Sequence, residues 1–465
     1  EHIRKVYFIG IGGIGMSAIA RFFLYKGAQV SGYDRTRTDL TQALEREGAQ
    51  ITYIDDVAYA DASADLVIYT PAIPKDSAIL NFYRSRGVEL KKRADVLGIL
   101  SRHQRCLAVG GTHGKTTTSC LLTHLLHSSG IDCSAFLGGI SQSLGSNFAI
   151  GKENIVVVEA DEFDRSFLHL HPAIAIITST DADHLDIYGD EMSIQDSYRQ
   201  FARQTTEQLI HRQNLPLFYE NDASPTVLQA REIVSYSATL REEEPLPDVY
   251  ADNIGIRDGF FHFDYINTPK NIAFRDIQTA LCGVHNIENA VAATTAALAV
   301  GATETGIRTG LRTFAGIQRR FEFVLRRSDR VYIDDYAHHP TELKAAIAAA
   351  RRLYPQERLV GVFQPHLYTR TRDFVDGFAE ALDLLDEAIL MDIYPARELP
   401  IEGVTSEIIF ERMRLRDKTL LTKAELLPYL QQRLSDKQRP TLRLLLTLGA
   451  GDIGAMVGEV RDMLG

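Results

Sequence analysis

Apolar runs and amphipathic stretches alternate along the first hundred residues in the order expected of an α/β domain. Residues 6–9 form a short apolar run, and residues 16–26 have the apolar spacing of a helix that stops at Gly27. A second strand is expected at residues 29–33, which lead directly to Asp34. The pattern predicts a strand, a glycine turn, a helix and a second strand, and the alternation continues to about residue 104.

The alternation restarts in the middle of the chain. An apolar run at residues 106–109 leads into a short loop and then a helix over residues 117–129. Residues 155–158 and 173–177 are continuous apolar runs, which is typical of parallel strands covered on both faces. Residues 205–280 are less regular and richer in turn residues, so we expect a small peripheral sheet there.

A third unit begins near residue 322, after an alanine-rich helix over residues 285–300. It contains a strand at residues 331–333, a helix begun by Pro340, and further strands at residues 359–363, 388–393 and 442–448. At 465 residues the chain has room for about three domains. The sequence therefore predicts three α/β units with boundaries near residues 104 and 322.

Composition and charge exclude several classes of protein. Hydrophobic residues make up 45% of the chain and charged residues 24%, as in ordinary globular proteins. A net charge of -11 argues against nucleic acid as a partner. We expect no membrane segment, because no apolar run approaches the ~20 residues needed to span a bilayer.

The cysteines and the first residues of the chain indicate a cytoplasmic location. The four cysteines are scattered and form no C-x-x-C pair, so free thiols in a reducing compartment are expected (Cys106, Cys120, Cys133 and Cys282). Residues 1–30 read as strand, turn and helix rather than as a basic region followed by a cleavage site.

The loop between residues 110 and 117 has the composition of a triphosphate-binding loop. Its glycines allow backbone N–H groups to face phosphate oxygens, a lysine can reach the terminal phosphates, and a threonine can bind Mg²⁺. The loop departs from the usual pattern, because Val109 stands where a first glycine is expected. The alternative is a glycine turn with a solvated lysine that binds no phosphate. The predicted ATP-binding residues of the loop are Gly111, Thr112, His113, Gly114, Lys115, Thr116 and Thr117.

Two side chains after the next strands could complete a metal site beside this loop. Glu159 stands at the end of the strand at residues 155–158, and His184 follows the strand at residues 173–177. Ligands of parallel sheets bind at the carboxyl ends of strands. Alone, Glu159 could be a surface acid and His184 a hydrogen-bonded loop histidine. Their places beside the loop indicate instead that both are metal ligands, together with Thr116.

The first glycine turn fits the dinucleotide-binding fingerprint. Gly10, Gly12 and Gly15 form G-x-G-x-x-G between a strand and a helix, and Asp34 follows about twenty residues later. Alone, this motif would favour NAD. Because a second nucleotide loop follows, the motif indicates a diphosphate site without specifying hydride chemistry.

Two late clusters follow strands of the third unit. Residues 334–340 bring together acids and histidines, and residues 363–372 carry arginines that could bind a carboxylate or phosphate. Surface salt bridges are the alternative for both clusters. For His339 we predict a structural role.

Taken together, these motifs resemble the Mur ligase family over essentially the whole chain. The resemblance rests on eight motifs in order, at residues 9–17, 111–117, 159–162, 183–186, 283–289, 319–322, 334–340 and 449–453. It implies an α/β protein with a Rossmann-like domain for a UDP-linked substrate at residues 1–104 and a Rossmann-like amino-acid domain at residues 322–465. Between them, at residues 105–321, it implies a central phosphate-loop ATPase domain with a parallel sheet and a small peripheral sheet.

The resemblance also implies an activity and roles for particular residues. It is closest to the branch that uses ATP and Mg²⁺ to join L-alanine to the lactyl carboxylate of UDP-N-acetylmuramate through an acyl phosphate. Lys115, Glu159 and His184 would be catalytic. The ATP-binding set would also include His285, Asn286 and Asn289 at the adenine and Arg320 and Asp335 near phosphate and ribose. The substrate-binding set would be Gly12, Gly13, Ile14, Gly15, Asp34, His184, Tyr336, His338 and Arg370.

Departures from the family pattern bear on the choice of branch. The chain has no lysine between Lys152 and Lys270, whereas other branches use a carboxylated lysine beside the second metal, so the alanine-adding branch is favoured. Leu367 stands where many relatives have arginine, and Ser179-Thr180 replaces a more usual Asn-Ile pair.

Three alternative functions stay open at this point. They are a tripeptide-recycling ligase acting on the same UDP-sugar, an NAD-dependent oxidoreductase and a non-catalytic nucleotide-binding regulator. A monomer or a homodimer is expected.

Overall fold

The computed structural model describes residues 3–70, 73–181, 190–217, 229–396, 398–436 and 438–465. They divide into two compact units. The first contains Glu1–Ile254, His262–Thr279 and Glu288–Ala315, and the second contains Gly255–Phe261, Ala280–Ile287 and Gly316–Gly465. Among the described helices, none combines the length and the apolar character needed to cross a membrane.

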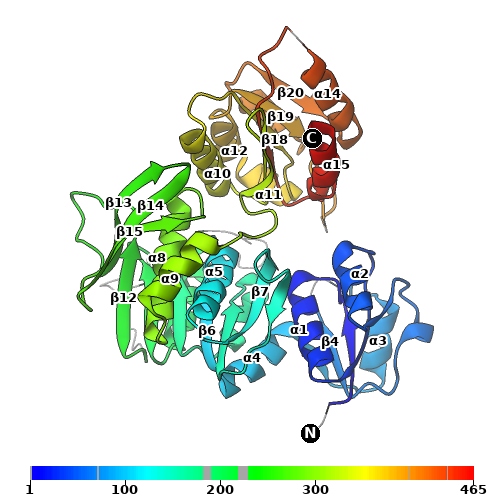
Figure 1. The fold of residues 1–465 in the computed structure, drawn as a ribbon. Helices are drawn as coiled ribbons and strands as arrows, with labels where there is room; N and C mark the ends of the chain where they lie inside the picture. Colours follow the sequence, from blue (N-terminus) through cyan, green and yellow to red (C-terminus); the bar gives the residue numbers. More distant parts are fainter. Residues whose placement is uncertain (1–2, 71–72, 182–189, 218–228, 397, 437) are drawn as a thin grey trace. The chain divides into compact units, whose positions relative to one another are not determined.

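The first unit begins with a five-stranded parallel sheet in the order β3-β2-β1-β4-β5. Its strands are β1 (Lys5–Ile9), β2 (Gln29–Tyr33), β3 (Gln50–Thr52), β4 (Leu66–Tyr69) and β5 (Leu90–Lys92). The sheet is accompanied by α1 (Ile14–Tyr25), α2 (Asp39–Arg46), α3 (Ala78–Ser85), α4 (Arg93–His103) and the short 3-10 helix η1 (Val57–Tyr59) (Figure 1). The strand, turn and helix predicted around the first glycine motif are confirmed.

A second sheet of ten strands follows in the order β15-β14-β13-β12-β11-β10-β6-β9-β7-β8. The strands are β6 (Arg105–Gly110), β7 (Ser134–Ser141), β8 (Ser146–Ala149), β9 (Ile155–Glu159), β10 (Ile174–Ile177), β11 (Gln208–Arg212), β12 (Glu232–Ser237), β13 (Val249–Arg257), β14 (Phe260–Asn267) and β15 (Ile272–Thr279). The strands expected to form a peripheral sheet continue the main sheet, because β12 pairs with both β11 and β13.

The helices of this region are α5 (Lys115–Ser128), η2 (Phe163–His169), α7 (Glu191–Arg203), α8 (Val284–Ala299) and α9 (Glu304–Thr313). Four parallel strands, β9, β6, β10 and β11, are adjacent in the sheet. Because they run in one direction, their carboxyl ends meet at one edge, where α5 begins. That edge therefore carries the candidate nucleotide site.

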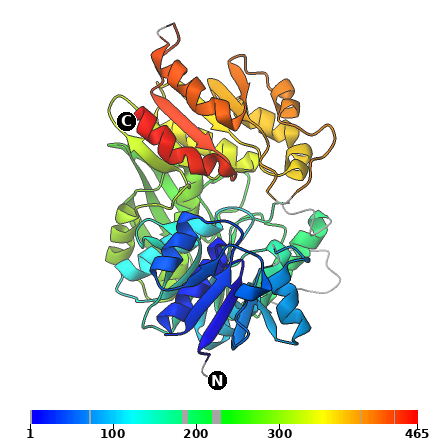
Figure 2. The same ribbon diagram turned by 90° about the vertical axis from the view of Figure 1, so that its right-hand side faces the viewer.

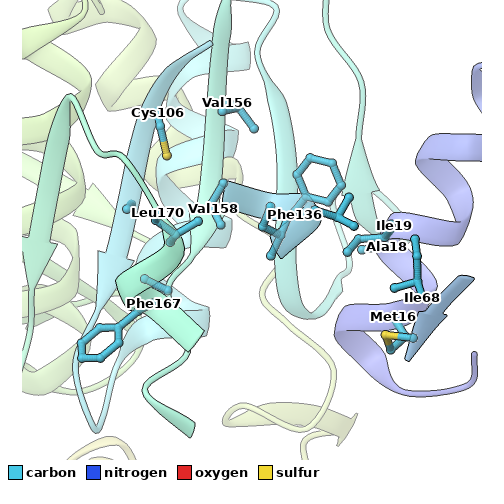
Figure 3. Close-up of a cluster of buried hydrophobic side chains, with 14 of the residues drawn as sticks. Met16, Ala18, Ile19, Ile68, Cys106, Phe136, Val156, Val158, Phe167 and Leu170 are labelled. Atoms are coloured by element: carbon cyan, nitrogen blue, oxygen red, sulfur yellow. The ribbon is translucent and has the colours of Figure 1, made fainter. Parts of the chain in front are cut away.

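One hydrophobic core extends from the ten-stranded sheet to the five-stranded sheet of the first unit. Figure 3 shows Phe136 of β7 between Val158 of β9 and Ile19 of α1. The ring of Phe136 also lies 5.9 Å from that of Phe22 on α1, measured between centroids. Since burying an aromatic side chain stabilises a fold by roughly 1.5–3 kcal/mol, this packing fixes α1 against the second sheet.

The second unit contains a six-stranded sheet in the order β16-β17-β21-β18-β19-β20. The strands are β16 (Glu322–Arg326), β17 (Val331–Asp335), β18 (Leu359–Phe363), β19 (Glu387–Met391), β20 (Lys418–Leu421) and β21 (Leu444–Leu448). All are parallel to their neighbours except β16, which is antiparallel to β17.

Helices cover both faces of this third sheet. One hydrophobic cluster joins its strands to α10 (Pro340–Leu353), α12 (Val375–Leu382) and α13 (Glu407–Arg412). Another joins them to α14 (Lys423–Ser435), η3 (Asp452–Met456) and α15 (Val457–Leu464), the red helix in Figure 2. The short helix α11 (Tyr368–Asp373) follows β18. The predicted α/β fold is confirmed.

Candidate active site

Two glycines give the loop between β6 and α5 its shape. Gly111 has φ +135° and Gly114 has φ +82°, both in the region that favours glycine. A Cβ atom on Gly111 would lie 2.0 Å from Thr178 Oγ1, and one on Gly114 would lie 2.6 Å from Asn289 Oδ1. Gly114 immediately precedes Lys115, the first residue of α5. The loop therefore forms a tight turn at a helix N-terminus, as phosphate binding requires.

The end of β10 holds this loop from one side. Thr112 N–H donates to Ser179 O at 3.2 Å, and the Thr112 hydroxyl donates to Asp181 O at 2.8 Å. His113 N–H donates to Ser179 Oγ at 2.8 Å, and His113 Nε2 lies 3.3 Å from Asp181 Oδ2. Ser179, one of the departures noted in the sequence, thus contributes its hydroxyl to the loop. Thr117 is buried in the first turn of α5.

Lys115 is held across the loop by a buried carboxylate. Its Nζ donates to Gly111 O at 2.7 Å and to Glu162 Oε1 at 2.9 Å, and Glu162 is 4% exposed. Burial would lower the pKa of Lys115, but Glu162, Asp161 and Glu159 outweigh it and raise that pKa above its ordinary value. Lys115 is therefore positively charged at physiological pH.

Glu159 at the end of β9 lies next to the first turn of α5. Its Oε1 accepts from Thr116 Oγ1 at 3.1 Å, and its Oε2 accepts from Gly138 N–H at 2.9 Å and from Ser119 Oγ at 3.4 Å. A Cβ atom on Gly138 would lie 2.0 Å from Glu159 Oε1, so β7 must have glycine at this point. A carboxylate beside a threonine hydroxyl is an oxygen donor pair that suits Mg²⁺.

The remaining predicted metal ligand, His184, lies outside the described residues. Within the described part of the chain, no group of three or more His, Cys, Asp and Glu side chains is arranged to hold a metal ion. Thr116 and Glu159 are thus the predicted metal ligands that the structure brings together.

The first glycine loop connects β1 to α1. Gly12 N–H donates to Asp34 Oδ2 at 2.7 Å, and Asp34 Oδ1 accepts from Thr36 N–H at 3.0 Å. Gly13 precedes α1, so the helix begins without a side-chain cap. Ile14 is 36% exposed at the first position of the helix. The predicted residues Gly12 to Gly15 therefore lie at the N-terminus of α1, and Asp34, which follows β2, is hydrogen-bonded to them.

In the second unit, Asp335 ends β17 and organises the turn that follows. It accepts from Phe321 N–H and from Ala337 N–H, both at 2.7 Å. Burial raises the pKa of Asp335 to about 7, against the opposing effect of the Arg320 guanidinium. Arg320 Nη1 lies 3.9 Å from Glu342 Oε1.

A cluster of aromatic, histidine and arginine side chains lies beside this turn. Tyr336 has the Arg320 guanidinium 5.2 Å from its ring centroid. The rings of His338 and His366 are 6.1 Å apart between centroids, and Arg370 Nη1 lies 3.2 Å from His366 Nδ1. The structure thus gathers Tyr336, His338 and Arg370, with His366 between the last two.

The start of α8 supplies the last predicted ATP residues. His285 is partly buried, and desolvation lowers its pKa to about 4, so the imidazole is neutral at physiological pH. Asn286 Nδ2 donates to Cys282 O at 2.8 Å. Asn289, on the same helix, lies against Gly114 in the first unit.

The structural role predicted for His339 agrees with its contacts. Its Nδ1 accepts from Thr341 N–H at 3.3 Å at the N-terminus of α10, and its ring packs on Phe374 at 4.7 Å. Leu367, one of the departures noted in the sequence, is buried, with 6% of its surface exposed.

Sequence reasoning missed two residues that face the candidate loops. Glu162 lies inside a motif that was recognised, but its ion pair with Lys115 joins segments 47 residues apart. Arg93, which contacts Gly15, stands in no motif. The only available signal for Glu162 was its place three residues after Glu159.

Three family models match successive parts of the chain. Residues 5–105 match the description "Mur ligase family, catalytic domain", residues 109–297 match "Mur ligase middle domain", and residues 319–451 match "Mur ligase, glutamate ligase domain". The chain belongs to the Mur ligase family and is an ATP-dependent ligase.

Two curated relatives within the family are similar to this chain over its full length. The chain is 44% identical to the UDP-N-acetylmuramate–L-alanine ligase of Flavobacterium psychrophilum, with 100% of this chain and 99% of that protein covered. It is 45% identical to the enzyme of the same name from Porphyromonas gingivalis strain ATCC 33277, with 99% of each covered.

Two solved structures resemble the fold. The UDP-N-acetylmuramate–alanine ligase of Thermotoga maritima superposes with a TM-score of 0.81 at 25% identity, and 100% of each chain is covered. A murein peptide ligase from Psychrobacter arcticus gives a TM-score of 0.71 at 22% identity over 99% of each chain, which shows a shared fold.

Proposed function

We propose that this enzyme joins L-alanine to the lactyl carboxylate of UDP-N-acetylmuramate, with ATP converted to ADP and phosphate. One observation carries the proposal. Lys115 and the Thr116–Glu159 pair meet at the loop between β6 and α5, in a chain that aligns end to end with L-alanine-adding ligases. The product would be UDP-N-acetylmuramoyl-L-alanine, a precursor in peptidoglycan synthesis.

ATP would bind with its phosphates on the loop from Gly111 to Thr117. In this position the N-terminus of α5 and the Lys115 ammonium face the β- and γ-phosphates. Thr116 and Glu159 would hold Mg²⁺ together with phosphate oxygens, since Mg²⁺ is usually bound by one or two carboxylates and substrate phosphates. His184 is the further ligand that we propose. When bound, Mg²⁺ would neutralise charge that develops on the phosphates.

The adenosine would be held by the second group of predicted residues. We propose His285, Asn286 and Asn289 for the adenine, and Arg320 and Asp335 for phosphate and ribose. A neutral His285 fits this role, because it can both donate and accept a hydrogen bond.

The chemistry requires activation of the carboxylate, because a carboxylate oxygen is a poor leaving group. A carboxylate oxygen attacks the γ-phosphorus of ATP, the bond to ADP breaks, and an acyl phosphate forms. The neutral amine of alanine then attacks the acyl carbon, a proton is lost, and phosphate departs with the amide left behind. Lys115 stabilises the negative charge of both steps and reduces repulsion between carboxylate and γ-phosphate.

The two substrates that are joined would bind at the other predicted groups. The UDP part would lie on the loop of Gly12 to Gly15 with Asp34, at the N-terminus of α1. The muramoyl and alanine groups would face Tyr336, His338 and Arg370. Arg370 would pair with a carboxylate. We assign these roles to the domains at residues 1–104, 105–321 and 322–465, in a cytoplasmic monomer or homodimer.

ADP formation across a matrix of substrates tests this proposal. We expect turnover only when ATP, Mg²⁺, UDP-N-acetylmuramate and L-alanine are all present. Faster turnover with L-Ala-γ-D-Glu-diaminopimelate than with L-alanine would overturn the proposed acceptor in favour of the recycling activity. A change at the nicotinamide absorbance band without ATP would instead indicate an oxidoreductase.

A further inference from the structure

Arg93, the first residue of α4, lies against the glycine loop of the five-stranded sheet. A Cβ atom built on Gly15 would lie 1.9 Å from Arg93 Nη1 and 2.8 Å from Arg93 Cζ. The guanidinium therefore covers the first turn of α1 at a point where any side chain larger than glycine would displace it. This position is the one at which a helix N-terminus attracts an anion.

Among the residues that the structure describes, Asp161 is the carboxylate partner of this guanidinium. Arg93 Nη2 donates to Asp161 Oδ2 at 3.1 Å, and the side chain of Arg93 is 20% exposed while that of Asp161 is 39% exposed. Asp161 Oδ1 also accepts from Phe163 N–H at 3.0 Å, which fixes the carboxylate. Since a guanidinium has five donors in a planar fork, one contact to Asp161 leaves donors that can face a second anion.

A second ion pair, between Lys92 and Asp164, lies next to the Arg93–Asp161 pair in the sequence. Lys92 Nζ lies 2.6 Å from Asp164 Oδ2, and Asp164 and Arg165 both have left-handed backbone angles, with φ +53° and +55°. Left-handed angles cost free energy for residues other than glycine, so the turn is maintained by its surroundings. In this arrangement Asp161 pairs with Arg93, and Asp164 pairs with Lys92 at the start of α4.

We propose that Arg93 binds the diphosphate of the UDP-linked substrate, with Asp161 as its counter-ion in the free enzyme. This inference rests on the proposed function, because it assumes that the glycine loop binds the UDP part. An arginine matches the geometry of phosphate oxygens with two parallel hydrogen bonds, and the contact adds to the electrostatic effect of the α1 N-terminus.

Calorimetric titration of the full chain with UDP, UMP and uridine tests the inference. Arg93→Ala should weaken UDP binding on the order of tenfold to a hundredfold, as expected for losing hydrogen bonds to a charged group. Uridine binding should stay unchanged, and UMP binding should weaken less than UDP binding. Arg93→Lys keeps the charge without the fork and should lie between wild type and Arg93→Ala.

Two further variants serve as controls. Arg102→Ala removes the same charge from the exposed end of α4 and should leave all three affinities at the wild-type level. Asp161→Asn removes the competing carboxylate, so UDP should bind at least as tightly as it does to the wild type.

Arg93 would have no diphosphate role if Arg93→Ala bound all three ligands with wild-type affinities. The same conclusion would follow if both variants lost affinity for UDP and uridine equally, since that result indicates a structural role. Failure of the wild type to bind UDP, together with no ADP formation from UDP-N-acetylmuramate, would overturn the proposed function as well.

Discussion

Lys115 is the residue on whose charge the proposed reaction depends most directly. It faces a buried carboxylate, and its pKa is raised by the three acids of residues 159–162. In the proposed complex the phosphates of ATP would add to the anions around it. Removing the ammonium should therefore affect the chemical step rather than substrate binding alone.

We predict that Lys115→Ala lowers the rate of ADP formation at least about 100-fold, as for other groups that stabilise transition-state charge. The substitution also leaves Glu162 buried without its partner, which destabilises the fold. The double variant Lys115→Ala/Glu162→Gln should restore the melting temperature without restoring activity. Lys152→Ala, at an exposed position, is the control. Unchanged phosphate release in Lys115→Ala would favour a non-catalytic nucleotide-binding protein.

The lowered pKa of His285 leads us to predict that the free energy of unfolding depends on pH. Its folded-state pKa of about 4 lies below the unfolded value of about 6.5, so the unfolded chain binds the proton first as the pH falls. Stability is then full above about pH 6.5 and is lost toward pH 4, by at most about 3 kcal/mol. His285→Gln, which does not titrate, should show a weaker dependence when urea unfolding is followed across this window. Parallel curves for the two proteins would contradict the assignment of a partly buried, neutral imidazole.

At the scale of elements, buried strands were the easiest to predict. The runs that became β9 and β18 are continuous apolar segments, and each was located to within one residue. Helix α5 begins two residues earlier than predicted, because Gly114 takes the left-handed conformation and lets the helix start at Lys115.

Other features depend on contacts between distant segments, which a single sequence does not reveal. The left-handed turn at Asp164 and Arg165 contains no glycine, and its partner Lys92 lies 72 residues away. The Arg93–Asp161 pair spans 68 residues. The tight turn from Gly111 to Gly114 could be predicted, because its glycines stand between a buried strand and a helix.

The turn between β6 and α5 leads to a prediction about glycine. Gly114→Ala should weaken ATP binding on the order of tenfold, because the new methyl group would displace Asn289 and shift the loop. Gly130→Ala is a matched control, since Gly130 has φ +79° and no neighbouring atom within 4 Å of a Cβ. Both variants carry the same backbone strain, but only Gly114→Ala carries the clash. Equal ATP affinities, measured with a fluorescent analogue, would show that the contact with Asn289 is unimportant.

At the scale of the whole molecule, the candidate residues are distributed over both compact units. The lysine loop, Glu159 and the first glycine loop belong to the first unit, and Asp335, Tyr336 and Arg370 belong to the second. The boundaries predicted near residues 104 and 322 stay predictions. The shared core around Phe136 shows that the first two sheets are not packed independently (Figure 3).

The function of the whole chain could be inferred more precisely from its family resemblance than from physical arguments about single residues. Phosphate-binding loops can be derived from glycine spacing and helix ends, but the identity of the sugar and the amino acid cannot. Tyr336, His338 and Arg370 are grouped by the fold, yet aromatic, histidine and arginine side chains could bind many carboxylates. The choice of L-alanine therefore rests on the full-length relatives.

The central claim is that ATP activates the lactyl carboxylate of UDP-N-acetylmuramate as an acyl phosphate. The most direct test is a reaction in which both oxygens of that carboxylate carry a heavy isotope, followed by mass spectrometry of the products. We predict one heavy oxygen in the released phosphate and one in the amide of UDP-N-acetylmuramoyl-L-alanine. Phosphate without the heavy isotope would contradict the account.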